Sequence, residues 1–244
     1  MNSLTIVIPM AGRGSRFAKV GIPTPKPLID VLGKPMYAWA TDSLPLDLCE
    51  KLIFISLREH LDETDLLSDI KSRYGQYSPI ILPLDHVTDG QACTVLVAKE
   101  LIDNEKPLII FNADTFCRTS LDVNLKQMPS SVAGMLGVFH APGDRWSFAR
   151  TNSNGRVVET AEKRRISDLA CTGLYHFSRG KDFVRYAEAA IAANDRVNGE
   201  FYVAPIYNRM IADGMDIRVD IAQEAWALGT PEDLEIFLRD RNVQ

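Results

Sequence analysis

The 244-residue chain lacks the features that mark several specialised classes of protein. Its 27 Lys and Arg nearly balance 32 Asp and Glu, the formal charge is −5, and neither sign gathers in long blocks. We therefore expect no nucleic-acid partner and no anionic membrane surface as partner. No apolar run approaches the roughly 18 residues of a membrane span, and the first residues carry neither a basic region nor a cleavage site. We expect neither a membrane helix nor a signal peptide.

Cysteine is scarce and scattered. The four cysteines form no CxxC pair and lie far apart, at Cys49, Cys93, Cys117 and Cys171. The histidines are equally dispersed, at His60, His86, His140 and His176. Isolated thiols are typical of a reducing compartment, so we expect a cytoplasmic protein. With 46% hydrophobic residues the chain is long enough to bury a core without a disulfide or a metal.

The first half of the chain alternates short apolar runs with segments of helical periodicity. The predicted strands are Leu4–Pro9, Leu52–Ser56, Ile80–Pro83 and Leu108–Phe111. Apolar side chains recur at helical spacing from Met36 to Leu44 and from Thr94 to Leu101. Strands apolar at consecutive positions are buried on both faces of a parallel sheet. The order predicts an α/β fold, a doubly wound sheet covered by helices on both faces, that is, an α/β/α sandwich.

The second half predicts a mixed lobe. Its expected strands are Ser131–Phe139, Arg156–Ala161, Ala170–Phe177 and Asp216–Ile221. Its expected helices cover 183–191, 203–211 and Thr230–Leu238, the last beginning with the capping sequence Thr-Pro-Glu-Asp. No repeat or flexible linker interrupts the chain. We expect a single domain over 1–244, divided into a nucleotide-binding half (1–140), an acceptor-binding half (141–222) and a C-terminal helix (223–244).

A glycine-rich segment, Gly12-Arg-Gly-Ser-Arg-Phe17, follows the first predicted strand. Gly12 and Gly14 allow a tight turn that brings backbone N–H groups close to a ligand, as a triphosphate requires. Arg16 offers a bidentate contact to phosphate. The segment matches neither the dinucleotide fingerprint nor a Walker A loop. A glycine-rich turn with a surface arginine is the structural alternative.

Three further positions carry candidate chemistry. Lys26 stands between two prolines, so its backbone is stiff and its ammonium suits a phosphate undergoing substitution; a solvated loop lysine is the alternative. Asp114 follows the fourth predicted strand, where open α/β sheets bind ligands, and one Asp with phosphate oxygens commonly holds Mg²⁺; a loop-capping Asp is the alternative. Gln91 begins a helix and can face a base edge.

The combined order of motifs resembles the sugar-phosphate nucleotidylyltransferases, the pyrophosphorylases that make nucleotide sugars. The matching segments run through the whole chain: Gly12-Arg-Gly-Ser-Arg-Phe17, Pro25-Lys-Pro-Leu-Ile29, Gly33-Lys-Pro-Met36, Gly90-Gln91, Asn112-Ala-Asp114, Glu162-Lys163, Thr172-Gly-Leu-Tyr175 and Gly229-Thr-Pro-Glu-Asp233. The resemblance implies a Rossmann-like fold of the nucleotide-diphospho-sugar transferase type. It implies an enzyme that joins a nucleoside triphosphate (NTP) to a sugar 1-phosphate and releases pyrophosphate.

The resemblance also implies a nucleotide site. Backbone groups of the glycine-rich loop would cradle the base and triphosphate, at Ala11, Gly12, Gly14 and Ser15. Gly90 and Gln91 would read the base.

Catalytic roles follow by the same resemblance. Arg16 would contact the β and γ phosphates, and Lys26 the α phosphate. Asp114 would hold Mg²⁺. Because the attacking phosphate oxygen is already anionic, no general base is needed, and positioning with basic side chains supplies the acceleration.

The acceptor site is implied in the same way. Glu162 would bond sugar hydroxyls, Lys163 would meet the phosphate of the acceptor, and Gly173 would leave space for the sugar ring.

Two positions depart from the family pattern. Ala227 stands where many members place a second acidic metal ligand, so either Asp114 and phosphates suffice or another acid such as Asp220 substitutes. Arg164 and Arg165 follow the Glu-Lys pair in place of the usual proline. They could serve a more anionic acceptor or form a solvated basic loop.

The expected function is Mg²⁺-dependent synthesis of a nucleotide sugar for surface polysaccharide. Two alternatives stay open at this point. One is a cytidylyltransferase-type enzyme that acts on a non-sugar phosphate such as phosphocholine, and the other is a catalytically silent nucleotide-sugar-binding regulatory protein. The small-molecule partners would be the NTP and the sugar phosphate. A monomer and a homodimer are both compatible with the apolar helices near 183–191 and 203–211.

Overall fold

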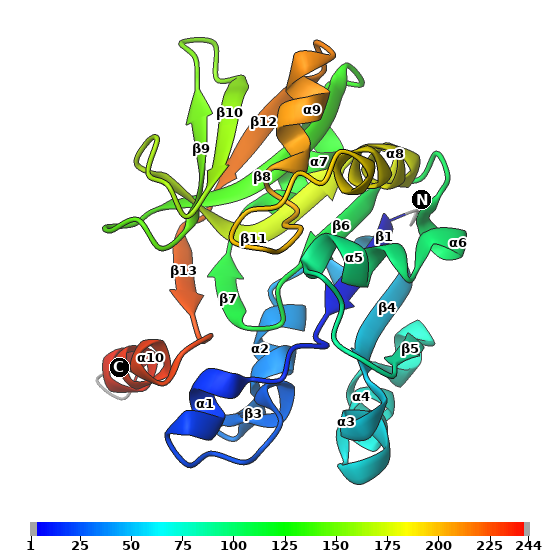
Figure 1. Cartoon of the computed structure of the whole chain (residues 1–244), viewed down its shortest axis with the longest axis vertical. Helices are drawn as coiled ribbons and strands as arrows, with labels where there is room; N and C mark the ends of the chain where they lie inside the picture. Colours follow the sequence, from blue (N-terminus) through cyan, green and yellow to red (C-terminus); the bar gives the residue numbers. More distant parts are fainter. Residues whose placement is uncertain (1–3, 242–244) are drawn as a thin grey trace.

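The computed structural model describes residues 4–241. Its centre is a nine-stranded mixed sheet in the order β10-β9-β11-β6-β1-β4-β5, with β8 paired to β11 and β12 paired to β8 (Figure 1). The strands of this sheet are β1 (Leu4–Pro9), β4 (Cys49–Leu57), β5 (Ile80–Leu84), β6 (Leu108–Phe111), β8 (Val132–His140), β9 (Ser147–Thr151), β10 (Val157–Glu162), β11 (Leu169–Phe177) and β12 (Asp216–Ile221).

Helices cover both faces of the sheet. The α-helices are α1 (Ser15–Lys19), α2 (Met36–Thr41), α3 (Arg58–Glu63), α4 (Leu66–Tyr74), α5 (Gln91–Leu96), α6 (Lys99–Ile102), α7 (Leu121–Gln127), α8 (Gly180–Ala192), α9 (Ile206–Ala212) and α10 (Pro231–Arg241). Side chains of α2, α4 and α7 pack in one apolar core with β1, β4 and β6. Those of α5, α6, α8 and α9 pack in a second core on the opposite face. The predicted doubly wound α/β/α sandwich is confirmed.

The strand order defines a switch point between β1 and β6. From β1 the chain crosses over one face to β4 and then to β5, and all three are parallel. It then returns across the other face to β6, which pairs with β1 on its free side. Ligands bind in open α/β sheets where successive crossovers leave in opposite directions. The carboxyl ends of β1 and β6 therefore mark the expected place for a site.

Several predicted elements match closely, and several were not predicted. β1, β6 and β12 have the predicted bounds. The predicted helix from Thr94 to Leu101 is broken into α5 and α6 by a turn at 97–98. The pattern does not predict α3, α4, α7 or β9, nor two small sheets, which pair β2 (Asp30–Val31) with β3 (Lys34–Pro35) and β7 (Thr115–Arg118) with β13 (Glu224–Ala227). The segment from 223 thus holds a strand before its predicted helix.

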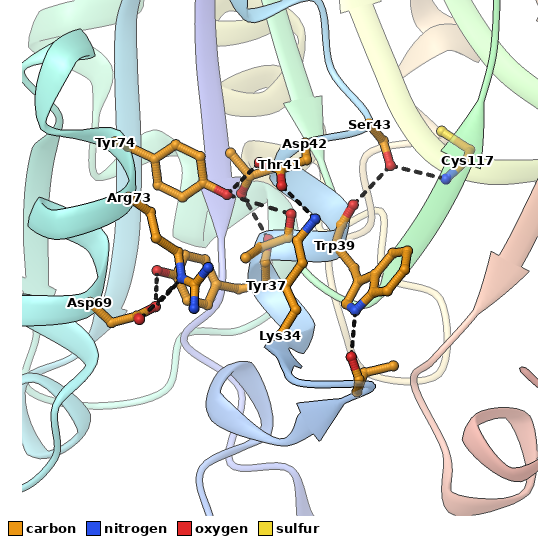
Figure 2. A network of polar contacts seen from close by, with 12 residues as sticks. Lys34, Tyr37, Trp39, Thr41, Asp42, Ser43, Asp69, Arg73, Tyr74 and Cys117 are labelled. Carbon is orange, nitrogen blue, oxygen red and sulfur yellow. Dashed lines mark hydrogen bonds and ion pairs between the residues drawn. The ribbon is translucent and has the colours of Figure 1, made fainter. Parts of the chain in front are cut away.

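A polar network around α2 fixes β7, which directly follows Asp114 (Figure 2). The phenols of Tyr37 and Tyr74 donate to Asp69 and Asp42, at 2.6 and 2.8 Å, and join α2 to α4. Ser43, just past the end of α2, accepts the backbone N–H of β7 at 3.1 Å. β7 is therefore anchored to the first half of the sheet as well as to β13.

No helix within residues 4–241 is long and apolar enough to cross a membrane.

Asp220 of β12 is a buried acid with a measurable consequence for stability. It is 1% exposed, its Oδ1 accepts from Asn124 at 2.5 Å, and its Oδ2 has no hydrogen-bond partner among residues 4–241. Burial raises the pKa of this carboxyl above its usual value. Because the unfolded chain releases the proton at lower pH than the folded protein, the free energy of unfolding falls as pH rises through this window.

We predict that Asp220→Asn removes this loss. The free energy of unfolding of the variant, minus that of the wild type, should rise from about pH 4, the ordinary pKa of Asp, up to the raised pKa in the folded protein. Above that pH the difference should stay constant. Urea unfolding between pH 4 and pH 8 measures the difference. The exposed Asp47→Asn variant is the control, and a stability difference independent of pH for Asp220→Asn would contradict the prediction.

Candidate active site

A cleft of about 860 Å³ opens at the switch point. It is lined from both halves of the chain, by the loops after β1 and β6, by the start of α5, by the start of β9 and the end of β10, and by the segment before α10. Ten of the predicted site residues line it: Ala11, Gly12, Arg16, Lys26, Gly90, Gln91, Asp114, Glu162, Lys163 and Gly173. The fold therefore gathers residues that are up to 162 positions apart in the sequence into one cavity.

Lys26 and Asp114 meet at the centre of this cleft. The Lys26 ammonium forms an ion pair with Oδ2 of Asp114, and each side chain is 25% exposed. Lys26 begins a short 3₁₀ turn, η1 (Lys26–Leu28), with Pro25 before it and Pro27 inside it. The two prolines fix the backbone on either side of the lysine. This pair places a cation and a carboxylate where the sheet exposes the ends of β1 and β6.

Two glycines fit the backbone closely around this ion pair. Gly14 has φ +63°, and a Cβ there would lie 2.9 Å from Cβ of Lys26. A Cβ on Gly229 would lie 2.6 Å from Oδ2 of Asp114. The β7–β13 pairing brings Gly229 to this position, and the N–H of Leu228 donates to the Asp114 carbonyl at 2.8 Å. Gly14 thus acts through Lys26, and neither it nor Ser15 is among the residues that line the cleft.

Gln91 lines the cleft at the start of α5. Its Nε2 donates to Oδ1 of Asn112 at 2.6 Å, which leaves its second N–H and its carbonyl oxygen for a ligand. Asn112 in turn packs on Gly173, where φ is +87° and a Cβ would lie 2.2 Å from the Asn112 amide. The structure therefore gives a second reason for Gly173, and the expected room for a sugar ring stays a prediction. The glycine makes room for Asn112.

Glu162 and Lys163 stand at the end of β10 on the other side of the cleft. Ser147 donates its hydroxyl to Oε2 of Glu162, and burial raises the pKa of Glu162. Lys163 donates to the hydroxyl of Tyr202 at 2.7 Å. Arg145, which was not predicted, also lines the cleft, with a bidentate pair to Asp233 at the start of α10. This side offers carboxylates and cations together, a set suited to a polar phosphate ester.

The other predicted site residues lie elsewhere. Arg164 points to Glu159 at 2.8 Å and is 66% exposed at its side chain. Arg165 donates to the carbonyls of Ala141 and Gly143, so it supports a loop. Neither arginine lines the cleft, so of the two alternatives their positions favour the solvated basic loop over contact with a more anionic acceptor.

Asp220 is also outside the cleft, buried beside Asn124. A second metal ligand at Asp220 is therefore contradicted by its position on β12. Local sequence could not reveal this, since the direction of a strand residue depends on pairing across the sheet.

The donor set around Asp114 fits a magnesium ion completed by substrate. Mg²⁺ sites commonly use one or two carboxylates together with phosphate oxygens and water. Within residues 4–241, no cluster of three or more His, Cys, Asp or Glu forms a protein cage for a metal. Ala227 lines the cleft close by and offers no side-chain oxygen.

Comparisons with known proteins agree with this architecture. Residues 6–236 match the family model described as nucleotidyl transferase. The chain is 26% identical over 235 residues to glucose-1-phosphate thymidylyltransferase of Neisseria meningitidis, covering 93% of this chain and 79% of that protein.

Solved structures give the same fold. A nucleoside-diphosphate-sugar pyrophosphorylase from Vibrio cholerae RC9 superposes with a TM-score of 0.82 at 32% identity, covering 96% of this chain and 100% of that one. The inositol-1-phosphate CTP transferase from T. maritima has a TM-score of 0.74 at 14% identity, with 95% and 91% coverage, which is a likeness of fold alone.

We predict that Gly173→Ala destabilises the protein more than Gly143→Ala does. Both glycines have positive φ, +87° and +78°, so both substitutions strain the backbone, but a Cβ at Gly143 meets nothing within 4 Å. The Asn112 amide must move in the Gly173 variant, which breaks its bond to Gln91. We expect an additional loss of about 1–3 kcal/mol in the free energy of unfolding, measured by urea denaturation. Equal losses would show that Asn112 is not the constraint.

Proposed function

Because the chain belongs to the nucleotidyl transferase family, we propose that this nucleotidyltransferase joins an NTP to a sugar 1-phosphate and releases pyrophosphate. The observation that carries the proposal is the convergence of Lys26 and Asp114 with Glu162 and Lys163 in one cleft. The first pair suits the phosphates of a nucleotide, and the second suits the hydroxyls and phosphate of an acceptor. We further propose that the enzyme works in the cytoplasm and that its nucleotide sugar is used for surface polysaccharide synthesis.

The proposed reaction needs positioning more than proton transfer. An anionic oxygen of the acceptor phosphate attacks the α phosphorus of the NTP, and the bond from that phosphorus to the bridging oxygen of the β phosphate breaks. The electron pair leaves with pyrophosphate. No proton has to be removed from the nucleophile, so the chain's task is to align the two phosphates and to neutralise the charge that they bring together.

Each proposed role follows from where the side chain lies. Lys26 exchanges its contact with Asp114 for an oxygen of the α phosphate, where negative charge builds. Arg16, exposed on α1 at the cleft, meets the departing β and γ phosphates. Asp114 would hold Mg²⁺, which, when bound, supplies charge neutralisation on the phosphates. The loop residues Ala11 and Gly12 let the triphosphate approach the backbone.

The proposed roles toward the acceptor belong to residues at the end of β10, on the other side of the cleft. Glu162 accepts from acceptor hydroxyls, and Ser147 orients its carboxylate. Lys163 supplies the charge for the acceptor phosphate. The contacts of Arg164 with Glu159 and of Arg165 with a loop weaken one argument for a more anionic, non-sugar acceptor, and this supports the sugar phosphate as acceptor. A silent regulatory protein has no requirement for Arg16, Lys26 and Asp114 in the same cleft, so an enzyme is the better explanation.

A substrate matrix tests the proposal directly. Purified protein with Mg²⁺ is given each NTP together with each of a panel of sugar 1-phosphates and non-sugar phosphates, and pyrophosphate release and product mass are measured. We expect turnover with at least one sugar 1-phosphate, with loss of turnover when EDTA removes the metal. A productive non-sugar phosphate alone would refute the acceptor class. An inactive matrix with nucleotide-sugar binding by calorimetry would instead support the regulatory protein.

We predict that Lys26→Gln and Asp114→Asn each lower kcat by about 10²–10³-fold, since each removes a preorganised charge from the reacting phosphates. Both replacements nearly preserve side-chain size, so thermal unfolding should show a folded protein. The control is Lys34→Gln, which removes a lysine that pairs with Asp42 beside α2, away from the cleft (Figure 2). Its kcat should stay within about twofold of wild type. Near-normal turnover of Lys26→Gln would remove this lysine from the reaction.

A further inference from the structure

The backbone of Lys163 sets the direction in which its side chain leaves the chain, but it does not hold the side chain in one rotamer. Its φ is +50°, a left-handed conformation that is uncommon for residues other than glycine, and its N–H donates to the Trp146 carbonyl at 2.9 Å. Such conformations persist where surrounding contacts impose them, and they gather at functional sites. The residue is nevertheless exposed, and a lysine side chain has many rotamers. Something beyond the backbone must hold the ammonium in one place.

Tyr202 makes that contact. The Lys163 ammonium donates to the Tyr202 hydroxyl at 2.7 Å and lies 4.8 Å from the centre of its ring. Burial raises the pKa of Tyr202, so the phenol stays neutral at physiological pH. A neutral oxygen orients the ammonium without cancelling its charge, whereas a carboxylate would neutralise it. The contact with Tyr202 therefore takes no charge from Lys163, and the negative charges near the pair are those of Glu162 and Glu200.

Tyr202 is itself held through its neighbour Phe201. The Phe201 N–H donates to the Asp89 carbonyl at 2.8 Å, and its carbonyl accepts from Ala92 at 3.0 Å. Between those two residues, Gly90 has φ +130°, and a Cβ there would lie 2.6 Å from both N and O of Phe201. The guanidinium of Arg196 stacks 4.2 Å over the Phe201 ring and pairs with Asp89. The loop that precedes Gln91 thus grips the residue next to Tyr202.

The chain beyond Tyr202 is fastened to β10, the strand that leads to Lys163. Thr160 donates its hydroxyl to the Ala204 carbonyl at 2.7 Å. The Asn208 amide accepts the Thr160 N–H and donates to the Thr160 carbonyl, both at 2.8 Å. Tyr202 therefore lies between two anchors, the loop at Gly90 and the strand that carries its lysine partner. Its position relative to Lys163 is set by backbone contacts on both sides.

We propose that Tyr202 is a positioning residue that holds the Lys163 ammonium for the phosphate of the acceptor. The inference rests on the proposed function, in which Lys163 contacts that phosphate. Tyr202 acts through Lys163 and adds no charge of its own, so its hydroxyl matters for acceptor binding and not for binding the NTP. This contact to the acceptor exists both before and during the reaction, and its loss raises KM for the acceptor with little change in kcat.

The first test is Tyr202→Phe, which removes the hydroxyl and keeps the ring. Loss of one hydrogen bond to a charged group should raise KM for the acceptor about tenfold, with KM for the NTP and kcat within about twofold of wild type. The matched control is Tyr186→Phe, which removes a phenol that donates to Asp213 at 2.7 Å outside the cleft. The control should leave all three constants unchanged. The probe pair is dTTP with glucose 1-phosphate, or the productive pair of the substrate matrix if that differs.

A double-mutant cycle tests whether Tyr202 acts through Lys163. The dissociation constant of the acceptor phosphate is measured by calorimetry for wild type, Tyr202→Phe, Lys163→Met and the double variant, so the cycle does not depend on turnover. We expect the Tyr202→Phe effect to disappear in the Lys163→Met background. An undiminished effect there, or a rise in KM for the NTP equal to that for the acceptor, would overturn the inference. A wild type that turns over no pair would instead overturn the proposed function.

Discussion

The ion pair between Lys26 and Asp114 is the contact around which the site is arranged. It joins the segment after β1 to the segment after β6, the two neighbouring strands whose crossovers leave in opposite directions. Gly14 packs against Lys26 and Gly229 packs against Asp114, so even a methyl group at either glycine would collide with the pair or its stem. Opposite charges only a quarter exposed interact more strongly than charges in open water, since the local dielectric is lower. The pair thus fixes where the halves of the cleft meet.

The cleft holds its two central lysines in different electrostatic conditions. Lys26 faces a carboxylate, and Lys163 faces a neutral phenol. A phosphate that binds Lys26 has to compete with Asp114, whereas a phosphate that binds Lys163 meets an ammonium whose hydrogen-bond partner is an uncharged phenol. This difference suits the two proposed substrates. The triphosphate brings several charges and can displace a carboxylate partner, while an acceptor with one phosphate gains most from a lysine that is already oriented and still charged.

The parts predictable from sequence were those determined by local pattern. β1 and β6 are buried at nearly every position, so their apolar runs give the bounds directly. The short strands β7 and β13 are partly exposed and exist because each supplies the other's hydrogen bonds across a long stretch of chain. In the same way, Lys26 and Asp114 stand in recognisable segments, while Tyr202 stands in no motif and acquires its place from contacts with Phe201 and Lys163. Arg164 and Arg165 show the opposite case. They directly follow the Glu162-Lys163 pair in the sequence, but this position does not determine the direction of their side chains.

The pairing of Asp114 with Lys26 has a consequence for how metal and nucleotide would bind in the proposed reaction. Ala227 is the residue of β13 that lies beside the start of β7, next to Asp114. The β7–β13 sheet, which positions the Asp114 carboxylate, therefore adds no second acidic ligand. One carboxylate that is already paired with an ammonium is a weak site for a divalent ion. In the proposed reaction the phosphates of the NTP strengthen this site in two ways. They draw Lys26 away from Asp114, and they supply oxygen ligands of their own. In the proposed reaction, metal and nucleotide would therefore strengthen each other's binding, because each needs the groups that the other releases or provides.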